Sequence, residues 1–360
     1  MIKYFRVIKK FLSKNNDLDI VQKKWMKGSL KTNFDFSEFS KKNLFNKLSD
    51  TSDYGFYYWP YGYLFRHVKW GGINSLGFRT DIEFENFDKI KDMFQIGFFG
   101  GSTGFDILVP NEKTIVYKLE NKLNSDHSVQ KKIGKAKVIN YSQPGNVIIN
   151  QIINFIQFGQ LANLKIVISH SSGNDFGAGL ISDPKIVKKY KIVYLDILEA
   201  WSKKVHESKY DIDLSFSDIN EKTFKPVEIK TDTKTSLDAY IFRVNQFSEI
   251  VNSQEKKFIN GIMPHIFSKK KLSSEELKIK SNSNLYYQKM FDVLPKLYFE
   301  LNQKFKSEKP NYEIINFHEL FENLTDKKTH FGDFVHLLEE GNEIVAEHYF
   351  LRIKKMLEIS

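Results

Sequence analysis

The stretch "FQIGFFGGSTGFD", Phe94 to Asp106, is an apolar run that stops at two glycines and then presents a serine and a threonine. A short apolar run that ends in glycine is typical of a strand buried on both faces of a sheet. Gly100 and Gly101 give the chain room to turn after that strand. We therefore expect Ser102 to stand at the exposed tip of the turn, where a hydroxyl can serve as a nucleophile.

The alternation of apolar strand and amphipathic helix continues downstream. Strands are expected at 94–99, 137–141, 165–169, 258–267 and 312–317. Helices are expected at 115–123, 146–161, 237–251, 284–305 and 341–357. In the helix at 146–161, the inward-facing side chains should be Ile148, Ile149, Ile152, Ile153, Ile156 and Phe158. This order of elements predicts an α/β fold with a parallel sheet covered on both faces.

Polar residues follow the strands at the points where they end. Ser102 follows the first strand, Gly145 of "SQPGN" follows the second, and Asn174 of "HSSGND" follows the third. Asp333 and His336 follow the last strand. Ligands of open parallel sheets bind beyond the carboxyl ends of the strands, so these residues are expected to meet at one edge.

This set of side chains suits acyl transfer. Ser102 needs a base to take its proton, His336 can be that base, and Asp333 can orient the imidazole. The attacked carbonyl becomes an oxyanion, which needs donors already aimed at it. The backbone N–H groups of Ser102 and Gly145 and the side-chain amide of Asn174 are the candidates.

At these residues the sequence resembles the SGNH hydrolases, also called GDSL esterases or lipases. The resemblance rests on "INSLGFRTD", "FFGGSTGFD", "NYSQPGN", "SHSSGNDFG" and "GDFVHLLEEGNEIVAE", in this order. The first phrase followed by "GGST" is similar to a bacterial branch often associated with surface-polysaccharide genes. The resemblance implies a flavodoxin-like three-layer α/β/α sandwich with about five parallel strands.

The resemblance also implies the roles of the residues. Ser102 would be the nucleophile, Gly145 and Asn174 the oxyanion donors, and Asp333 with His336 the rest of the triad. No cofactor and no metal would be needed. Two positions depart from the family pattern. Gly101 replaces the aspartate of the better-known motif, and Gly173 directly precedes Asn174 where the family has one residue between them.

Two other kinds of site are conceivable at these residues. A phosphate-binding loop needs a Gly-x-x-x-x-Gly-Lys pattern, which does not follow Ser102. His330, Asp333 and His336 are spaced by three and could bind zinc or iron. For His330, a place in a loop near the pocket is preferred. His170 either lines the pocket or is buried beside the sheet, and the sequence leaves both open.

Composition limits the class of partner. The chain has 360 residues, 41% of them hydrophobic, and carries a net charge of +10. Arginine is rare and the lysines are mixed with acidic residues, so nucleic-acid binding is not expected. The segment at 268–276, rich in Lys, Ser and Glu, is expected to be a solvated loop. There is no cysteine, which excludes disulfides and thiolate chemistry.

Residues 1–90 are expected to form an N-terminal extension packed on a hydrolase domain at 91–360, which has an insertion at about 178–234. Residues 1–14 place lysines opposite an apolar face. They either dock on the domain or touch an anionic membrane surface. The aromatic stretch at 54–70 either covers a core edge or stacks on sugar rings. Without a signal-peptide pattern, a cytoplasmic location is expected, with a possible peripheral contact at the inner membrane face.

The sequence thus predicts a serine esterase that cleaves O-acyl esters, foremost O-acetyl esters of a carbohydrate. Two alternatives stay open. An O-acyltransferase would use the same triad on a glycan, and a catalytically silent glycan-binding protein would use the pocket without turnover. The oligomeric state and the acyl acceptor do not follow from the sequence.

Overall fold

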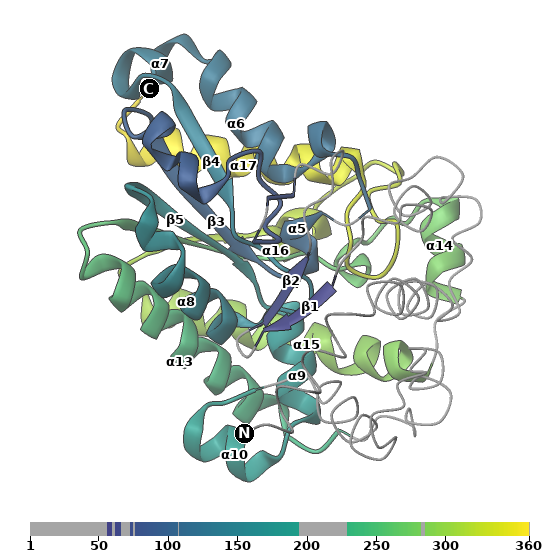
Figure 1. The fold of residues 1–360 in the computed structure, drawn as a ribbon. Helices are drawn as coiled ribbons and strands as arrows, with labels where there is room; N and C mark the ends of the chain where they lie inside the picture. The colour runs from purple at the N-terminus through teal and green to yellow at the C-terminus, as the bar shows by residue number, and fades with distance from the viewer. Residues whose placement is uncertain are drawn as a thin grey trace, which may run out of the picture.

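A five-stranded parallel sheet forms the centre of the molecule, with strand order β4-β3-β5-β6-β7 (Figure 1). The computed structural model describes residues 56–59, 62–65, 73–74, 76–106, 108–193, 229–281 and 285–359. The strands are β3 (Phe94–Gly100), β4 (Ala136–Asn140), β5 (Leu164–Ser171), β6 (Lys257–Ile262) and β7 (Glu313–Asn316). All four neighbouring pairs of this sheet are parallel, which confirms the predicted sheet.

Helices cover both faces of the sheet (Figure 1). One layer contains α6 (Ile115–Ser125), α7 (His127–Ile133), α16 (Phe317–Glu322) and α17 (Glu339–Met356). The opposite layer contains α8 (Ile148–Gln157), α9 (Gly173–Ile181), α13 (Thr233–Asn252) and α15 (Leu285–Glu308).

The strand residues explain the two layers. Side chains of a strand alternate between the faces of its sheet. In β3, Ile96 and Phe98 belong to the core cluster with α6 and α17, while Phe99 belongs to the cluster with α8 and α13. All three side chains are fully buried. Both faces are therefore hydrophobic cores, and the predicted three-layer α/β/α architecture is confirmed.

Shorter elements complete the described chain. The helices are α5 (Ser102–Phe105), α10 (Pro184–Tyr190) and α14 (Ser274–Ser281). The 3-10 turns are η1 (Phe84–Ile90), η2 (Asn111–Lys113), η3 (Gly159–Leu161) and η4 (Ile266–Ser268). β1 (Phe56–Trp59) and β2 (Gly62–Phe65) form an antiparallel hairpin, which precedes the strands of the main sheet and is not part of that sheet.

Polar caps fix where several helices begin. Thr114 Oγ1 accepts from the Tyr117 amide at 3.2 Å at the start of α6. Asp232 Oδ1 accepts from the Thr235 amide at 2.8 Å at the start of α13. Such caps satisfy backbone donors that have no partner inside the helix.

Some expected boundaries differ from the observed ones. The helix expected at 146–161 is shorter, because α8 ends at Gln157 and a 3-10 turn follows. Ile156 was expected to face inward but is 48% exposed, and Phe155 takes its place in the core. The strand expected at 258–267 ends at Ile262, since Pro264 and the turn η4 follow.

Much of the N-terminal extension and of the expected insertion lies outside the described residues. This applies to residues 1–55, with the expected helix at 1–14, and to residues 194–228. Of the aromatic stretch at 54–70, only the backbone of the β1–β2 hairpin is described. The described ends of the expected insertion at 178–234 contain α10 and lead into α13. No helix in the described ranges is long and apolar enough to span a bilayer.

The strand order determines where a ligand site can form. From β3 the chain moves to β4 on one side, and from β4 it crosses to β5 on the other side of β3. A sheet with such a reversal opens a crevice at the carboxyl ends of the strands on either side of it. These ends are Gly100 of β3 and Ser171 of β5, which lead directly into Ser102 and Asn174.

Candidate active site

Ser102 is the first residue of the short helix α5, directly after the end of β3. The helix has only one turn, Ser102–Phe105, and Asp106 ends it in the left-handed conformation with φ 61°. A helix of a single turn supplies little dipole to stabilise charge at Ser102. The strand and its tight turn, rather than a long helix, place the serine.

A buried arginine holds this turn from behind. The guanidinium of Arg79 donates to the carbonyl oxygens of Phe105 at 2.9 Å and Val109 at 2.7 Å. It also donates to the carbonyl of Asp106 and to the side chain of Asn111. Arg79 belongs to the phrase "INSLGFRTD", so this upstream segment serves to fix the turn that presents Ser102.

Ser102, His336 and Asp333 form one hydrogen-bonded chain. His336 Nε2 lies 2.7 Å from Ser102 Oγ, and His336 Nδ1 lies 2.5 Å from Asp333 Oδ2. The side chains of His336 and Asp333 are 14% and 16% exposed. The structure therefore brings together three residues that are separated by up to 234 positions, in the order of a nucleophile, a base and an orienting carboxylate.

The second carboxylate oxygen of Asp333 fixes the loop that carries His336. Asp333 Oδ1 accepts from the backbone amides of Val335 at 2.9 Å and His336 at 2.7 Å. Burial raises the pKa of Asp333, but the neighbouring His336 and these hydrogen bonds outweigh it and hold the pKa below its usual value. Asp333 is thus an ionised partner for an imidazolium.

Gly145 lies in the loop between β4 and α8, and Asn174 lies in the first turn of α9. Gly145 has a φ of 79°, a conformation that favours glycine. The Gln143 amide of the same loop donates to the Gly100 carbonyl at 3.1 Å, and Asn174 Nδ2 donates to the Asn146 carbonyl at 2.9 Å. The loop with Gly145 is thereby joined to the end of β3 on one side and to Asn174 on the other.

The structure accounts for Gly101, the first departure from the family pattern. Its backbone, with φ −89° and ψ −151°, is open to any residue. A Cβ atom built there would lie 2.5 Å from Asn174 Nδ2 and 3.2 Å from the Asn146 carbonyl oxygen. A side chain at position 101 would therefore displace the Asn174 amide.

The second departure, Gly173 directly before Asn174, coincides with strained backbone. Ser172 has φ 122° and ψ −49°, a conformation that costs free energy for a non-glycine residue. Ser172 Oγ lies 2.8 Å from the hydroxyl of Tyr298, which in turn lies 3.0 Å from His265 Nδ1. A Cβ on Gly173 would lie 2.7 Å from His265 Nε2. These contacts hold the turn that delivers Asn174.

Sequence reasoning missed Arg79, Ser172, His265 and Tyr298 as supports of the site. The phrase "MPHIF" was a usable signal. Pro264 ends the strand that was expected to run to residue 267, so His265 follows a strand end as the other blocks do. Burial lowers the pKa of His265 well below its ordinary value, and the neighbouring His318 adds to the shift. His265 is therefore a neutral imidazole.

Among the described residues, neither His170 nor His330 belongs to a metal cluster. His170 is fully buried, and its Nδ1 lies 2.9 Å from the hydroxyl of Tyr349, so it belongs to the core. His330 is also buried, and its Nε2 lies 3.7 Å from Asp326. Within the described part of the chain, no group of three or more His, Asp or Glu side chains could hold a metal ion.

No protein-family model matches the chain, and no curated protein matches its sequence. Solved structures match at low identity. A G-D-S-L family lipolytic protein from Veillonella parvula is 15% identical, covers 72% of this chain and 99% of its own, and has a TM-score of 0.39. A catalytic mutant of an acetylxylan esterase from Geobacillus stearothermophilus is 12% identical, with 74% and 95% covered and a TM-score of 0.40. A lipase/acylhydrolase from Enterococcus faecalis is 12% identical, with 73% and 97% covered and a TM-score of 0.39. These TM-scores are below 0.5, so a function has to be inferred from the residues of this chain alone.

Proposed function

We propose that this chain is a serine esterase of the SGNH type that cleaves O-acyl esters through an acyl-enzyme on Ser102. The observation that carries the proposal is the continuous series of hydrogen bonds from Ser102 Oγ through His336 to Asp333. A hydroxyl bonded to an imidazole that is itself bonded to an ionised carboxylate is the arrangement that activates a serine.

The first half of the reaction forms the acyl-enzyme. Ser102 Oγ attacks the carbonyl carbon of the ester while His336 Nε2 takes the hydroxyl proton. Asp333 stabilises the resulting imidazolium. The C–O bond to the alcohol then breaks, and His336 returns the proton to the departing oxygen. Water then attacks the acyl carbonyl carbon while His336 takes its proton. The bond from that carbon to Ser102 Oγ breaks, His336 returns the proton to Ser102 Oγ, and the acyl group leaves as a carboxylic acid.

The negative oxygen of each tetrahedral intermediate needs hydrogen-bond donors. The backbone amides of Ser102 and Gly145 and the side-chain amide of Asn174 are the proposed donors. One N–H of Asn174 is used by the Asn146 carbonyl, and an amide NH₂ group has a second one to offer. The bond to Asn146 therefore orients the Asn174 amide and leaves its second N–H free to donate to the oxyanion.

A carbohydrate acyl ester, foremost an O-acetyl ester, is the proposed substrate class. Support comes from the "INSLGFRTD" and "GGST" phrases, which are similar to a branch associated with surface polysaccharides, and from the aromatic stretch at 54–70. Release of acetate from acetylated oligosaccharides, compared with release of fatty acid from phospholipid, tests the substrate class. Preferential release of fatty acid would contradict it.

Hydrolysis of p-nitrophenyl acetate tests the reaction type. Ser102→Ala and His336→Ala are each expected to lower the rate by at least about 10⁴-fold, because each removes a member of one catalytic unit. Unchanged rates in both variants would remove the proposal. A wild-type enzyme that transfers acetyl to an added sugar hydroxyl faster than to water would instead identify the acyltransferase.

A further inference from the structure

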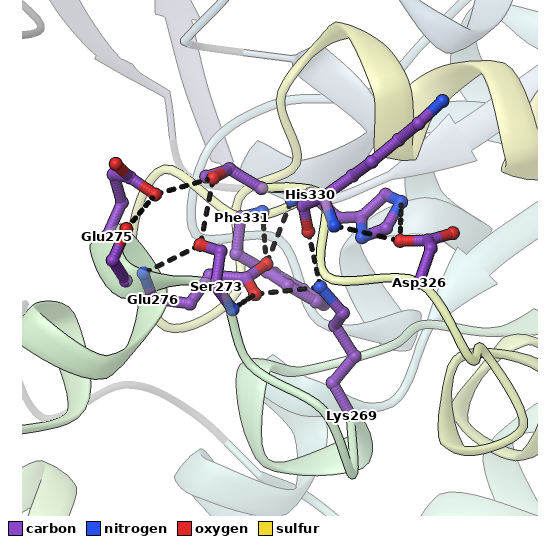
Figure 2. A network of polar contacts seen from close by, with 10 residues as sticks. Lys269, Ser273, Glu275, Glu276, Asp326, His330 and Phe331 are labelled. Carbon is purple, nitrogen blue, oxygen red and sulfur yellow. Dashed lines mark hydrogen bonds and ion pairs between the residues drawn. The ribbon is translucent and has the colours of Figure 1, made fainter.

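Lys269 and Glu276 form a buried ion pair (Figure 2). Glu276 binds the backbone of His330 and Phe331, just before the loop residues Asp333 and His336. Lys269 Nζ lies 2.7 Å from Glu276 Oε2, and both side chains are 0% exposed. The sequence suggested a solvated loop at 268–276. Lys270, Lys271, Ser274 and Glu275 are exposed, but the expectation is wrong for Lys269 and Glu276, which are buried. Among the ion pairs of the described residues, this one alone has both side chains fully buried.

Both charged groups also bind the backbone of one short segment (Figure 2). Glu276 Oε1 accepts from the amides of His330 at 2.8 Å and Phe331 at 3.2 Å. Lys269 Nζ donates to the carbonyl of Lys328. Glu276 Oε2 additionally accepts from the Ser273 amide at 2.8 Å, which fixes the carboxylate in place. The pair thus holds the backbone of residues 328–331 on both its donor and its acceptor side.

The held segment is one arm of the loop that carries the proposed base. Phe331 pairs with Leu337 in an isolated antiparallel bridge. The Leu338 amide donates to the His330 carbonyl at 2.8 Å, and the Gly332 amide donates to the His336 carbonyl at 3.0 Å. A displacement of His330 and Phe331 would therefore reach His336 through its neighbours Leu337 and Leu338 and through Gly332, which binds the His336 carbonyl.

A purely stabilising role does not account for this arrangement. Burial of two charges costs free energy that their attraction only partly recovers, and apolar replacements of buried pairs are often as stable or more stable. An apolar pair would fill the same space. It would not accept hydrogen bonds from the amides of His330 and Phe331, which need an oxygen in a defined place.

We propose that Glu276, oriented by Lys269, is a positioning residue for catalysis: it fixes the arm at 328–331 so that His336 Nε2 stays within reach of Ser102 Oγ. The inference rests on the proposed function, since it assigns Glu276 a part in presenting the base of that reaction. Displacement of a catalytic group by about 1 Å can lower a rate by about 10²-fold.

Two double variants separate the effect of the hydrogen-bond acceptor at position 276 from the effect of the two charges. Lys269→Met with Glu276→Gln removes both charges but keeps a carbonyl oxygen for the amides of His330 and Phe331. Lys269→Met with Glu276→Leu removes the charges and the oxygen. Val251 is a fully buried residue of α13, in the opposite helical layer, and Val251→Ala leaves a cavity there. This variant controls for lost stability alone.

The readouts are the rate of fluorophosphonate labelling of Ser102, kcat and KM for p-nitrophenyl acetate, and the downfield proton resonance of the His336–Asp333 hydrogen bond. The Leu double variant is expected to label and turn over roughly ten- to a hundred-fold more slowly, with little change in KM and a shifted or lost resonance. The Gln double variant should recover most of the rate, and Val251→Ala should label like the wild type.

Labelling of the Leu double variant at the wild-type rate would overturn the inference. If that variant does not fold, Glu276→Asp decides instead, because it keeps the charge beside Lys269 and withdraws the oxygens by one methylene. Slower labelling of Glu276→Asp supports the inference, and an unchanged rate overturns it. Absence of Ser102 labelling in the wild type would remove the proposed function itself, and with it the inference.

Discussion

Gly101 leaves open the space that the side-chain amide of Asn174 occupies. A Cβ atom on residue 101 would lie 2.5 Å from Asn174 Nδ2, closer than such atoms approach one another. A side chain at position 101, just before the proposed nucleophile, would thus compete for space with the amide of Asn174, the proposed oxyanion donor. The two departures from the family pattern, Gly101 and the adjacent Gly173–Asn174 pair, meet at this one place.

Gly101→Ala should therefore lower kcat by displacing the Asn174 amide. The backbone at 101 accepts alanine, so the stability of the fold should change little. We expect about a ten- to hundred-fold loss, which approaches that of removing one oxyanion donor. The measurements are kcat for p-nitrophenyl acetate and the midpoint of thermal unfolding, which checks that the stability is unchanged. The loss should nearly vanish in an Asn174→Ala background, because the two changes act on one group. Full additivity of the two losses would contradict the coupling.

Asn174→Ala should lower kcat by about 10²–10³-fold with a small effect on KM, since the oxyanion exists only in the transition state and the intermediate. Steady-state kinetics on p-nitrophenyl acetate measure both constants. Asn146, which supplies only a carbonyl to the Asn174 amide, offers a matched control. Its side chain can be changed to alanine while that carbonyl remains. A loss that is equal in Asn146→Ala and Asn174→Ala would argue against a donor role of Asn174.

Arg79→Met should destabilise the turn behind Ser102. The substitution leaves the buried carbonyl oxygens of Phe105, Asp106 and Val109 without the guanidinium that binds them. We expect a loss of roughly 3 kcal/mol in the free energy of unfolding, measured by urea denaturation. Arg79→Lys should recover only a part, because an ammonium cannot reproduce the planar fork. A midpoint equal to that of the wild type in Arg79→Met would refute this role.

Asp175 should make the stability depend on pH. Burial raises the pKa of Asp175 to about 7, against a backbone hydrogen bond from Ile148 that lowers it. Between about pH 4 and pH 7 the folded protein keeps a proton that the unfolded chain releases. The contribution of Asp175 to the free energy of unfolding is therefore greatest below pH 4. It falls by about 1.4 kcal/mol per pH unit as the pH rises from 4 to 7, and it is lost above pH 7.

Asp175→Asn should flatten that dependence, because the amide cannot ionise and its oxygen can still accept from the Ile148 amide. Urea unfolding at pH 5, 6, 7 and 8 measures the slope. The variant should be the more stable protein at pH 8. Some slope should remain from Asp106, whose pKa burial also raises to about 7. An unchanged slope would show that Asp175 is not protonated in the folded state.

The sheet and the meeting of Ser102, Asp333 and His336 could be predicted because each signal is local. An apolar run identifies a strand, and the residue after it is placed by the common rule for parallel sheets. Strand and helix ends were less accurate, as Ile156 shows, because the inward face of α8 depends on which turn packs against Phe99 and Phe247.

The supports of the site could not be predicted because they depend on contacts distant in sequence. Lys269 and Glu276 look like solvated residues, and only the backbone of residues 328–331 makes their burial possible. Arg79 lies in one of the phrases on which the family resemblance rests. Its partners are backbone carbonyl oxygens, and every residue has one, so the sequence does not indicate which of them an arginine binds. The need for glycine at 101 became visible only with the position of Asn174.

The measurement that tests the central claim most directly is the intact mass of the protein after reaction with a fluorophosphonate probe. The account predicts one adduct on the wild-type chain, none on Ser102→Ala, and strongly slowed labelling of His336→Ala. Such a result would show a serine activated by its imidazole partner. An unlabelled wild-type chain, or equal labelling of wild type and Ser102→Ala, would contradict the account.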